Sequence, residues 1–173
     1  MPKPLPPRTP GGPRFSISSC NCPDCRAACL NSPGWFMPRE IDKLAKHLDL
    51  DVPTLFRKYL AVGVTHMPDG ALRHGVMPHK LRDGKKPGTL WTLNELAQPG
   101  RCIFFDRGRC TIYEARPYEC ARMIHDRQKE SVKLRHHIVA AWTQAALRPF
   151  AELTGKKLSG GVPGGRNRRI RPA

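Results

Sequence analysis

The chain contains no long apolar run. No stretch of about 18 apolar residues occurs in its 173 residues, so the sequence predicts no membrane-spanning helix. The first residues, Met-Pro-Lys-Pro-Leu-Pro-Pro-Arg, carry positive charge, but no apolar segment follows them as it would in a secretory signal peptide. We therefore expect a cytoplasmic protein.

Acidic residues are missing from both ends of the chain, whose formal net charge is +16. The proline-rich residues 1–14 predict a disordered leader, and residues 154–173, rich in glycine and arginine, predict a flexible basic tail. Such tails suit nucleic acid phosphates or an acidic protein, although neither contains the interleaved aromatic residues that stack on bases. Their basic residues are Lys3, Arg8, Arg14, Lys156, Lys157, Arg166, Arg168, Arg169 and Arg171.

Between the two tails, residues 15–153 have the length of a single domain. Apolar residues at helical spacing predict two short helices after Pro38 and after Asp51, where Asp51 is the expected cap, and a longer helix over residues 131–151. Residues 64–86 show neither the helical nor the strand spacing of apolar residues, so they predict a long loop. A strand is predicted after it, near residues 89–93.

A short β-hairpin is predicted around Asp106-Arg-Gly-Arg109. Two β-prone runs, Cys102-Ile-Phe-Phe and Cys110-Thr-Ile-Tyr, flank this turn. We expect Cys102 and Cys110 on adjacent strands, and a helix that begins just before Cys120. The predicted fold class is α+β, mostly α-helical: a small irregular metal-organised domain with a short hairpin and flexible basic tails.

Seven cysteines are the most distinctive residues of the chain. So dense a first run cannot point every side chain into one apolar interior. An odd number of cysteines cannot form a pure disulfide framework, and structural disulfides are rare in a reducing compartment. The pattern therefore predicts that the thiols bind metal. The cysteines are Cys20, Cys22, Cys25 and Cys29, then Cys102, Cys110 and Cys120.

Other cysteine chemistries fit less well. Cys22 and Cys25 have the spacing of a dithiol redox pair, but no βαβ pattern surrounds them; no histidine follows Cys25 as haem attachment requires, and no His-x-Glu of a zinc deaminase occurs. Thiolates suit a structural zinc site, a pair of zinc ions or an iron–sulfur cluster. The residues alone leave the metal open, and they leave open whether His66, His74 or His79 is a ligand.

Two motifs together resemble a known family. The first is Cys22-x2-Cys25-x3-Cys29 with the Pro33-Gly-Trp-Phe that follows it; the second is Cys102-Ile-Phe-Phe-Asp-Arg-Gly-Arg-Cys110-Thr-Ile-Tyr-Glu-Ala-Arg-Pro-Tyr-Glu-Cys120. Over about residues 20–125 the chain is similar to the YkgJ-type cysteine-cluster family, whose CxxCxxCC domain is described as zinc- or iron-chelating.

The resemblance implies that the chain chelates a metal through six cysteines that match ligand positions of the family. The bound species would be iron, an iron–sulfur cluster or zinc. The paired cysteines that usually end the first run are Ala28 and Cys29 here, and Cys20 stands two residues before the run. Cys20 is therefore a further candidate ligand in place of the one missing at Ala28. The six carried-over ligands are Cys22, Cys25, Cys29, Cys102, Cys110 and Cys120.

Two functions follow from these features. The first is a metal-binding protein that chelates iron, as an ion or an iron–sulfur cluster, or zinc, with a redox or modifying activity in the iron case. The alternative is a zinc-organised, non-enzymatic module that binds nucleic acid or an acidic partner through its basic tails. In both, binding energy of the metal becomes folding energy, so metal removal is expected to collapse the fold.

Overall fold

The computed structural model describes residues 23–122 and 128–162, with side chains described for residues 27–122 and 131–162. Helical residues outnumber strand residues, which confirms the predicted α+β, mostly helical class. In this part of the chain, no helix has the length and apolar character needed to cross a membrane. The helices are α1 (Pro23–Asn31), α2 (Glu40–Leu48), α3 (Val52–Tyr59), α4 (Leu93–Ala97), the 3₁₀ helix η1 (Tyr113–Ala115), α5 (Tyr118–Ala121), α6 (Gln128–Ala141) and α7 (Gln144–Thr154); the strands are β1 (Leu60–His66), β2 (Leu72–Pro78), β3 (Lys80–Leu81), β4 (Arg101–Cys102), β5 (Phe105–Asp106) and β6 (Arg109–Cys110).

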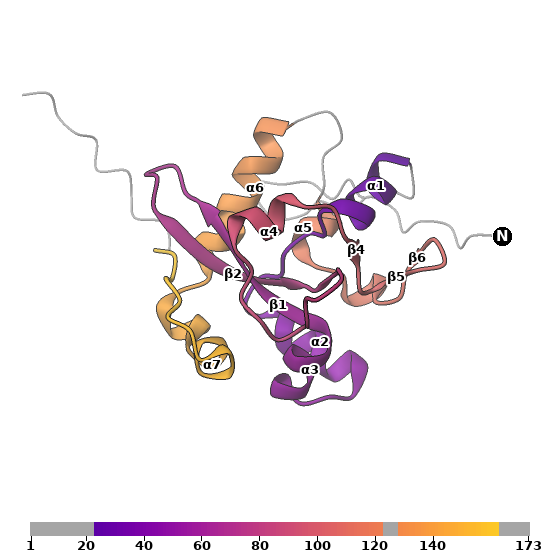
Figure 1. The fold of residues 1–173 in the computed structure, drawn as a ribbon, viewed down its shortest axis with the longest axis horizontal. Coiled ribbons are helices and arrows are strands. Elements are labelled where there is room, and N and C mark those ends of the chain that lie inside the picture. Colours follow the sequence, from indigo (N-terminus) through magenta and orange to yellow (C-terminus); the bar gives the residue numbers. More distant parts are fainter. Residues whose placement is uncertain (1–22, 123–127, 163–173) are drawn as a thin grey trace, which may run out of the picture.

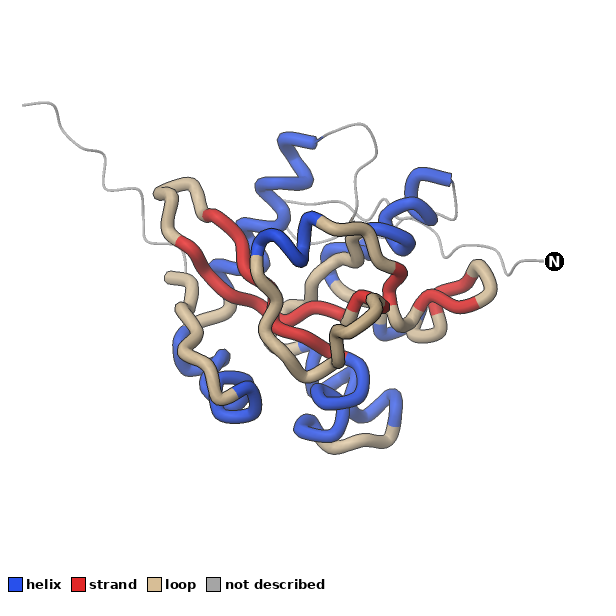
Figure 2. The backbone as a smooth tube through the Cα atoms, in the orientation of Figure 1, coloured by secondary structure: helices blue, strands red, loops and turns tan. Residues whose placement is uncertain are grey.

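The centre of the fold is the antiparallel hairpin β1–β2, paired from Leu60 opposite Pro78 to His66 opposite Leu72. Figures 1 and 2 show its strands running through the middle of the molecule with helices around them. The prediction of a loop over residues 64–86 is therefore wrong. The strand predicted near residues 89–93 is reduced to one bridge, between Leu90 and Val62.

Two glycines explain how this hairpin packs against Trp35 and why the sequence pattern does not reveal it. Gly63 and Gly75 face each other across the strands, and a Cβ atom at Gly63 would lie 2.5 Å from the indole ring of Trp35. The bare backbone of the pair therefore accommodates the fully buried Trp35 side chain. In the sequence, the same glycines interrupt the alternation of apolar residues that predicts a strand.

The two short helices predicted after Pro38 and Asp51 are confirmed as α2 and α3. On α2 the buried residues Ile41, Leu44 and Ala45 lie on one face. The α3 helix begins at the expected cap, where Asp51 Oδ1 accepts a hydrogen bond from the backbone N–H of Thr54 at 2.8 Å.

The long helix predicted over residues 131–151 is broken into α6 and α7. Thr143 caps α7, since its hydroxyl accepts a hydrogen bond from the backbone N–H of Ala146. Trp142 ends up buried at the break, where its indole N–H donates to the carbonyl of Phe36 at 2.7 Å. The apolar period continues through the break, so periodicity alone could not reveal it.

The structure extends past the predicted domain end at residue 153. Leu158 is buried, Ser159 exchanges hydrogen bonds with His74 on β2, and the N–H of Gly161 donates to the carbonyl of Trp142. The first part of the predicted flexible tail therefore packs on the domain. Residues 163–173 and the predicted leader, residues 1–14, lie outside the described residues.

Candidate metal centre

Four of the seven cysteines lie in the described part of the chain with their side chains, each on a different element. Cys29 is on α1, Cys102 ends β4, Cys110 ends β6 and Cys120 is on α5. The α1 helix packs against β4, and Figure 1 shows α1, α5 and β4–β6 on one side of the central hairpin. Segments far apart in the sequence thus bring the four thiols to one side of the molecule.

The four thiols are close enough for their charges to interact. Burial is the first cause that raises the pKa of each, and like-charge repulsion between thiols adds to it at Cys29, Cys102 and Cys120. Cys110 raises the pKa of Cys29 in this way, and Cys29 and Cys110 both raise the pKa of Cys102. The thiols of Cys29, Cys102 and Cys110 all raise the pKa of Cys120. Each thiol therefore belongs to one cluster.

Burial favours the neutral form of these thiols when no metal is bound. Cys102 is 7% exposed, and burial raises its pKa to about 12; burial also raises the pKa of Cys120 well above the usual value. At Cys110 the raising effect of burial is opposed by a backbone hydrogen bond and by the Arg116 guanidinium. Because the thiolate is the form that binds metal, metal binding must displace protons from these thiols.

The predicted hairpin is present, in a shorter form. Arg107 and Gly108 both have positive φ angles, 49° and 76°, which is the conformation of a tight two-residue hairpin turn. Phe105 pairs with Cys110 across it. Cys102, however, lies on β4, which pairs with β3, so the prediction that Cys102 and Cys110 lie on adjacent strands is wrong.

The helix predicted just before Cys120 is confirmed as α5, and a glutamate on α2 holds its first residue. Glu40 Oε2 accepts hydrogen bonds from the backbone N–H groups of Met37 at 2.7 Å and Tyr118 at 3.0 Å. Burial raises the pKa of this carboxyl, and the two backbone hydrogen bonds oppose the shift. The short α5 is thus fixed to the end of α2.

Sequence reasoning missed two residues beside Cys120. A Cβ atom at Gly34 would lie 2.7 Å from Cys120 Sγ, so only glycine fits there without a shift. Glu119 accepts a hydrogen bond from the backbone N–H of Trp35 at 2.9 Å. The Pro33-Gly34-Trp35 motif, already part of the family resemblance, was the available signal for a close backbone approach.

The other predicted cysteine ligands lie partly or wholly outside the part of the chain whose side chains the structure describes. Cys20 and Cys22 lie outside the described residues, and Cys25 lies on α1, one helical turn before Cys29. The histidines left open as ligands have other neighbours. His66 Nδ1 lies 3.4 Å from the carbonyl oxygen of Gly70, His74 accepts the N–H of Ser159, and His79 is buried against Trp91.

The donor chemistry of the cluster fits a thiolate-bound metal, because buried, mutually close thiols favour zinc and iron. Within residues 27–122 and 131–162, no three Cys, His, Asp or Glu side chains already surround a common point at ligand distances. The cysteine side chains therefore have to reorient, or be joined by those of the first run, to complete a coordination shell.

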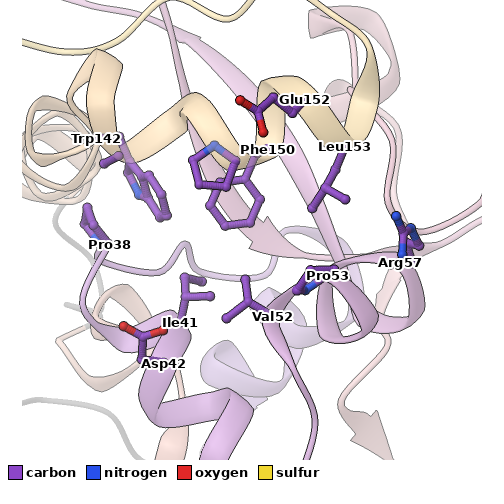
Figure 3. Close-up of a pocket in the computed structure, with 12 residues that line it drawn as sticks. Pro38, Ile41, Asp42, Val52, Pro53, Arg57, Trp142, Phe150, Glu152 and Leu153 are labelled. Atoms are coloured by element: carbon purple, nitrogen blue, oxygen red, sulfur yellow. The ribbon is translucent and has the colours of Figure 1, made fainter.

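A pocket of about 590 Å³ lies elsewhere, between α2, α3 and α7 (Figure 3). Apolar side chains such as Ile41, Val52 and Phe150 line it, with Asp42 and Glu152 at its rim. No cysteine is among its lining residues. This pocket is therefore separate from the thiol cluster.

Comparison with known families gives one match. The family model named CxxCxxCC, described as a "putative zinc- or iron-chelating domain", matches residues 21–138. The matched range contains Cys22 and the five cysteines after it, and it begins one residue after Cys20. Comparisons with curated proteins and with solved structures found no match.

Proposed function

Because the chain belongs to the CxxCxxCC family of zinc- or iron-chelating domains, we propose that it binds its metal through a thiolate centre shared by the two cysteine groups. The gathering of four thiols from α1, β4, β6 and α5 carries this proposal. Cys20 is an additional candidate, since it precedes the matched range. The proposed ligands are Cys22, Cys25, Cys29, Cys102, Cys110 and Cys120.

The proposed metal is iron, as an ion or an iron–sulfur cluster, or zinc. Both suit sulfur ligands. A bound metal would cross-link the short elements that carry the cysteines, and iron would in addition support a redox or modifying activity. The chain's own part is to hold the thiols together away from water and, through cations such as Arg116, to offset the negative charge of their thiolates.

Elemental analysis with a visible absorption spectrum, on protein purified anaerobically without added metal, tests this proposal. Stoichiometric iron with a thiolate-to-iron charge-transfer band supports the iron form, and a colourless protein with stoichiometric zinc supports the zinc form. Cys110→Ser is expected to lose the metal in either case. Wild-type protein that contains and takes up neither metal would refute the proposal.

The variant Cys20→Ser tests whether the metal site consists of the six family cysteines alone or also includes Cys20. Cys20 lies outside the range matched by the family, so the six other cysteines suffice if the family ligands are the whole site. Retention of full metal in Cys20→Ser, with loss in Cys110→Ser, would assign the site to the six. Equal loss in both would make Cys20 a ligand.

A second function is favoured by the charge near the cluster. Arg101, Arg107 and Arg109 are exposed on β4 and on the β5–β6 hairpin, and the Arg107 side chain is 93% exposed. We propose that this surface and the basic tails bind nucleic acid phosphates or an acidic partner. DNA and RNA titrated at two salt concentrations test it, because phosphate contacts weaken steeply with salt; no binding at low salt would end the nucleic acid proposal.

A further inference from the structure

One ion pair beside Cys120 is enclosed and geometrically complete. Glu119 Oε2 accepts a hydrogen bond from Arg135 Nε at 2.7 Å, and Glu119 Oε1 accepts one from Arg135 Nη2 at 2.7 Å. The two side chains are only 12% and 22% exposed. Such a two-point contact between a guanidinium and a carboxylate fixes orientation as well as distance.

This pair joins three parts of the chain that are distant in sequence. Glu119 belongs to α5 and Arg135 to α6, and Glu119 Oε2 also accepts the backbone N–H of Trp35 at 2.9 Å. The Arg135 guanidinium in turn lies over the Trp35 ring, 4.3 Å from its centre. Since Trp35 packs on Gly63 and Gly75 of the central hairpin, the ion pair ties α5 to that hairpin through Trp35.

The same contacts determine the surroundings of the Cys120 thiol. Gly34 precedes Trp35, and its Cα approaches Cys120 so closely that a Cβ atom there would lie 2.7 Å from Sγ and 2.8 Å from the Cys120 backbone nitrogen. A shift of α5 relative to Trp35 would therefore move the thiol against Gly34. Cys120 lies on α5, which has only four residues and little stability of its own.

From this geometry we infer that Glu119 and Arg135 are positioning residues of the metal centre: their ion pair holds α5 against Trp35, so that the Cys120 thiol faces the thiols of Cys29, Cys102 and Cys110. Arg135 also supplies a positive charge next to Glu119, which would otherwise stand as an unpaired carboxylate beside a metal-bound thiolate. This inference rests on the proposed thiolate centre. It adds two residues that touch no metal.

The test compares Glu119→Gln and Arg135→Lys with the wild-type chain. Glutamine keeps the shape and one acceptor but loses the charge, and lysine keeps the charge but loses the two-point contact. The matched control is Arg148→Lys with Glu152→Gln, a second Arg–Glu pair on α7 whose side chains are 80% and 71% exposed. Zinc affinity is measured by chelator competition, and Co²⁺ is loaded as a spectroscopic probe of the thiolate ligands.

We expect both variants to lose zinc affinity by about 10-fold to 100-fold, as is usual when residues that orient a ligand are changed. The Co²⁺ spectrum should show weaker thiolate-to-metal charge transfer, and the α7 control should behave like the wild type. Far-ultraviolet circular dichroism of the metal-free proteins checks that the fold persists. If Arg135→Lys does not fold, the nearly isosteric Glu119→Gln decides.

Two outcomes overturn the inference and are distinguishable. Wild-type affinity and an unchanged Co²⁺ spectrum in folded Glu119→Gln would refute the positioning role while leaving the proposed metal centre intact. A wild-type protein that contains no iron and takes up none of iron, Zn²⁺ and Co²⁺ would refute the proposed function and this inference with it.

Discussion

The core region and the cysteine region of this molecule differ most in the length of their strands. The core region comprises α2, α3, β1, β2, α6 and α7; its strands have seven residues each, and it buries Trp35 and Trp142 together with many aliphatic side chains. The cysteine region comprises α1, β4, β5, β6, η1 and α5, with two-residue strands and a four-residue helix. Elements so short are not stable alone.

This difference between the regions limits the part of the fold that a bound metal is expected to stabilise. We expect an apolar core of this extent to form without a metal, because apolar burial is the main driving force of folding, whereas the short elements of the cysteine region should depend more on cross-links. We therefore expect metal removal to loosen the cysteine region first, rather than to collapse the whole domain. Hydrogen exchange of the metal-free protein would show this as lost protection confined to the cysteine region.

The largest effect on stability should come from replacing Trp35, the residue that joins the two regions. Trp35→Ala empties the slot over Gly63 and Gly75 and also removes the ring on which Arg135 stacks. We expect a loss of about 3–5 kcal/mol in unfolding free energy, measured by urea unfolding followed by circular dichroism, together with weaker metal binding. Val132→Ala, at an exposed site on α6, is the control; equal stability of the two variants would refute the joining role.

The second-largest effect should come from lowering the pH, which acts on His79, the residue directly after β2. His79 is 1% exposed, and burial, aided by the charge of Lys85, lowers its pKa from 6.5 to about 4. The unfolded chain therefore takes up a proton before the folded one, so stability is present above the usual histidine pKa and falls as the pH drops from 6.5 towards 4. The loss is on the order of 2–3 kcal/mol.

Urea unfolding of metal-free protein across this pH range measures the effect of His79. His79→Gln should flatten the pH dependence, while His47→Gln, at an exposed position on α2, should leave it unchanged. Identical slopes in the wild type and His79→Gln would show that another group is responsible.

Gly34→Ala should act on the cysteine region. The added methyl group would lie 2.7 Å from Cys120 Sγ, so the thiol or the backbone has to move, at a cost of about 1–3 kcal/mol. We expect reduced metal affinity along with reduced stability, measured by chelator competition and by thermal unfolding. Ser32→Ala, nearby and exposed, is the matched control, and unaltered affinity in Gly34→Ala would contradict the close packing at Cys120.

The smallest effect should come from the cap of α3. Asp51→Ala removes the acceptor for the N–H and hydroxyl of Thr54, and the loss of this exposed cap should lower the unfolding free energy less than any change above. Because α3 belongs to the core region, metal content should stay at the wild-type level. Loss of metal in this variant would show that the two regions are more tightly coupled than the packing suggests.

The sequence predicted local features of the fold better than contacts between distant segments. The α2 and α3 helices follow from the spacing of Ile41, Leu44 and Ala45 and from the cap at Asp51, which are properties of neighbouring residues. The β1–β2 hairpin was not predicted because Gly63 and Gly75 are explained only by the Trp35 ring that packs on them, which is a contact between distant segments. The break between α6 and α7 depends in the same way on remote partners of Trp142.

The candidate site shows the same limit. Counting cysteines identified all seven as one set of candidate ligands, and the structure brings the thiols of four of them near one another: Cys29, Cys102, Cys110 and Cys120. The strand on which Cys102 lies could not be foreseen, because β4 pairs with the distant β3. Glu119 and Arg135 were equally hidden, since a charged residue reveals its partner only after α5 and α6 are packed together.

The packing of Trp35 on Gly63 and Gly75 also has a consequence for the order in which the chain folds during synthesis. The slot over Gly63 and Gly75 exists only after β1 and β2 have paired, and every residue of that hairpin leaves the ribosome before Cys102, Cys110 and Cys120 do. The growing chain can thus fix Gly34 in place before its later cysteines have left the ribosome. We expect the metal to be captured late, by a chain whose core has already formed.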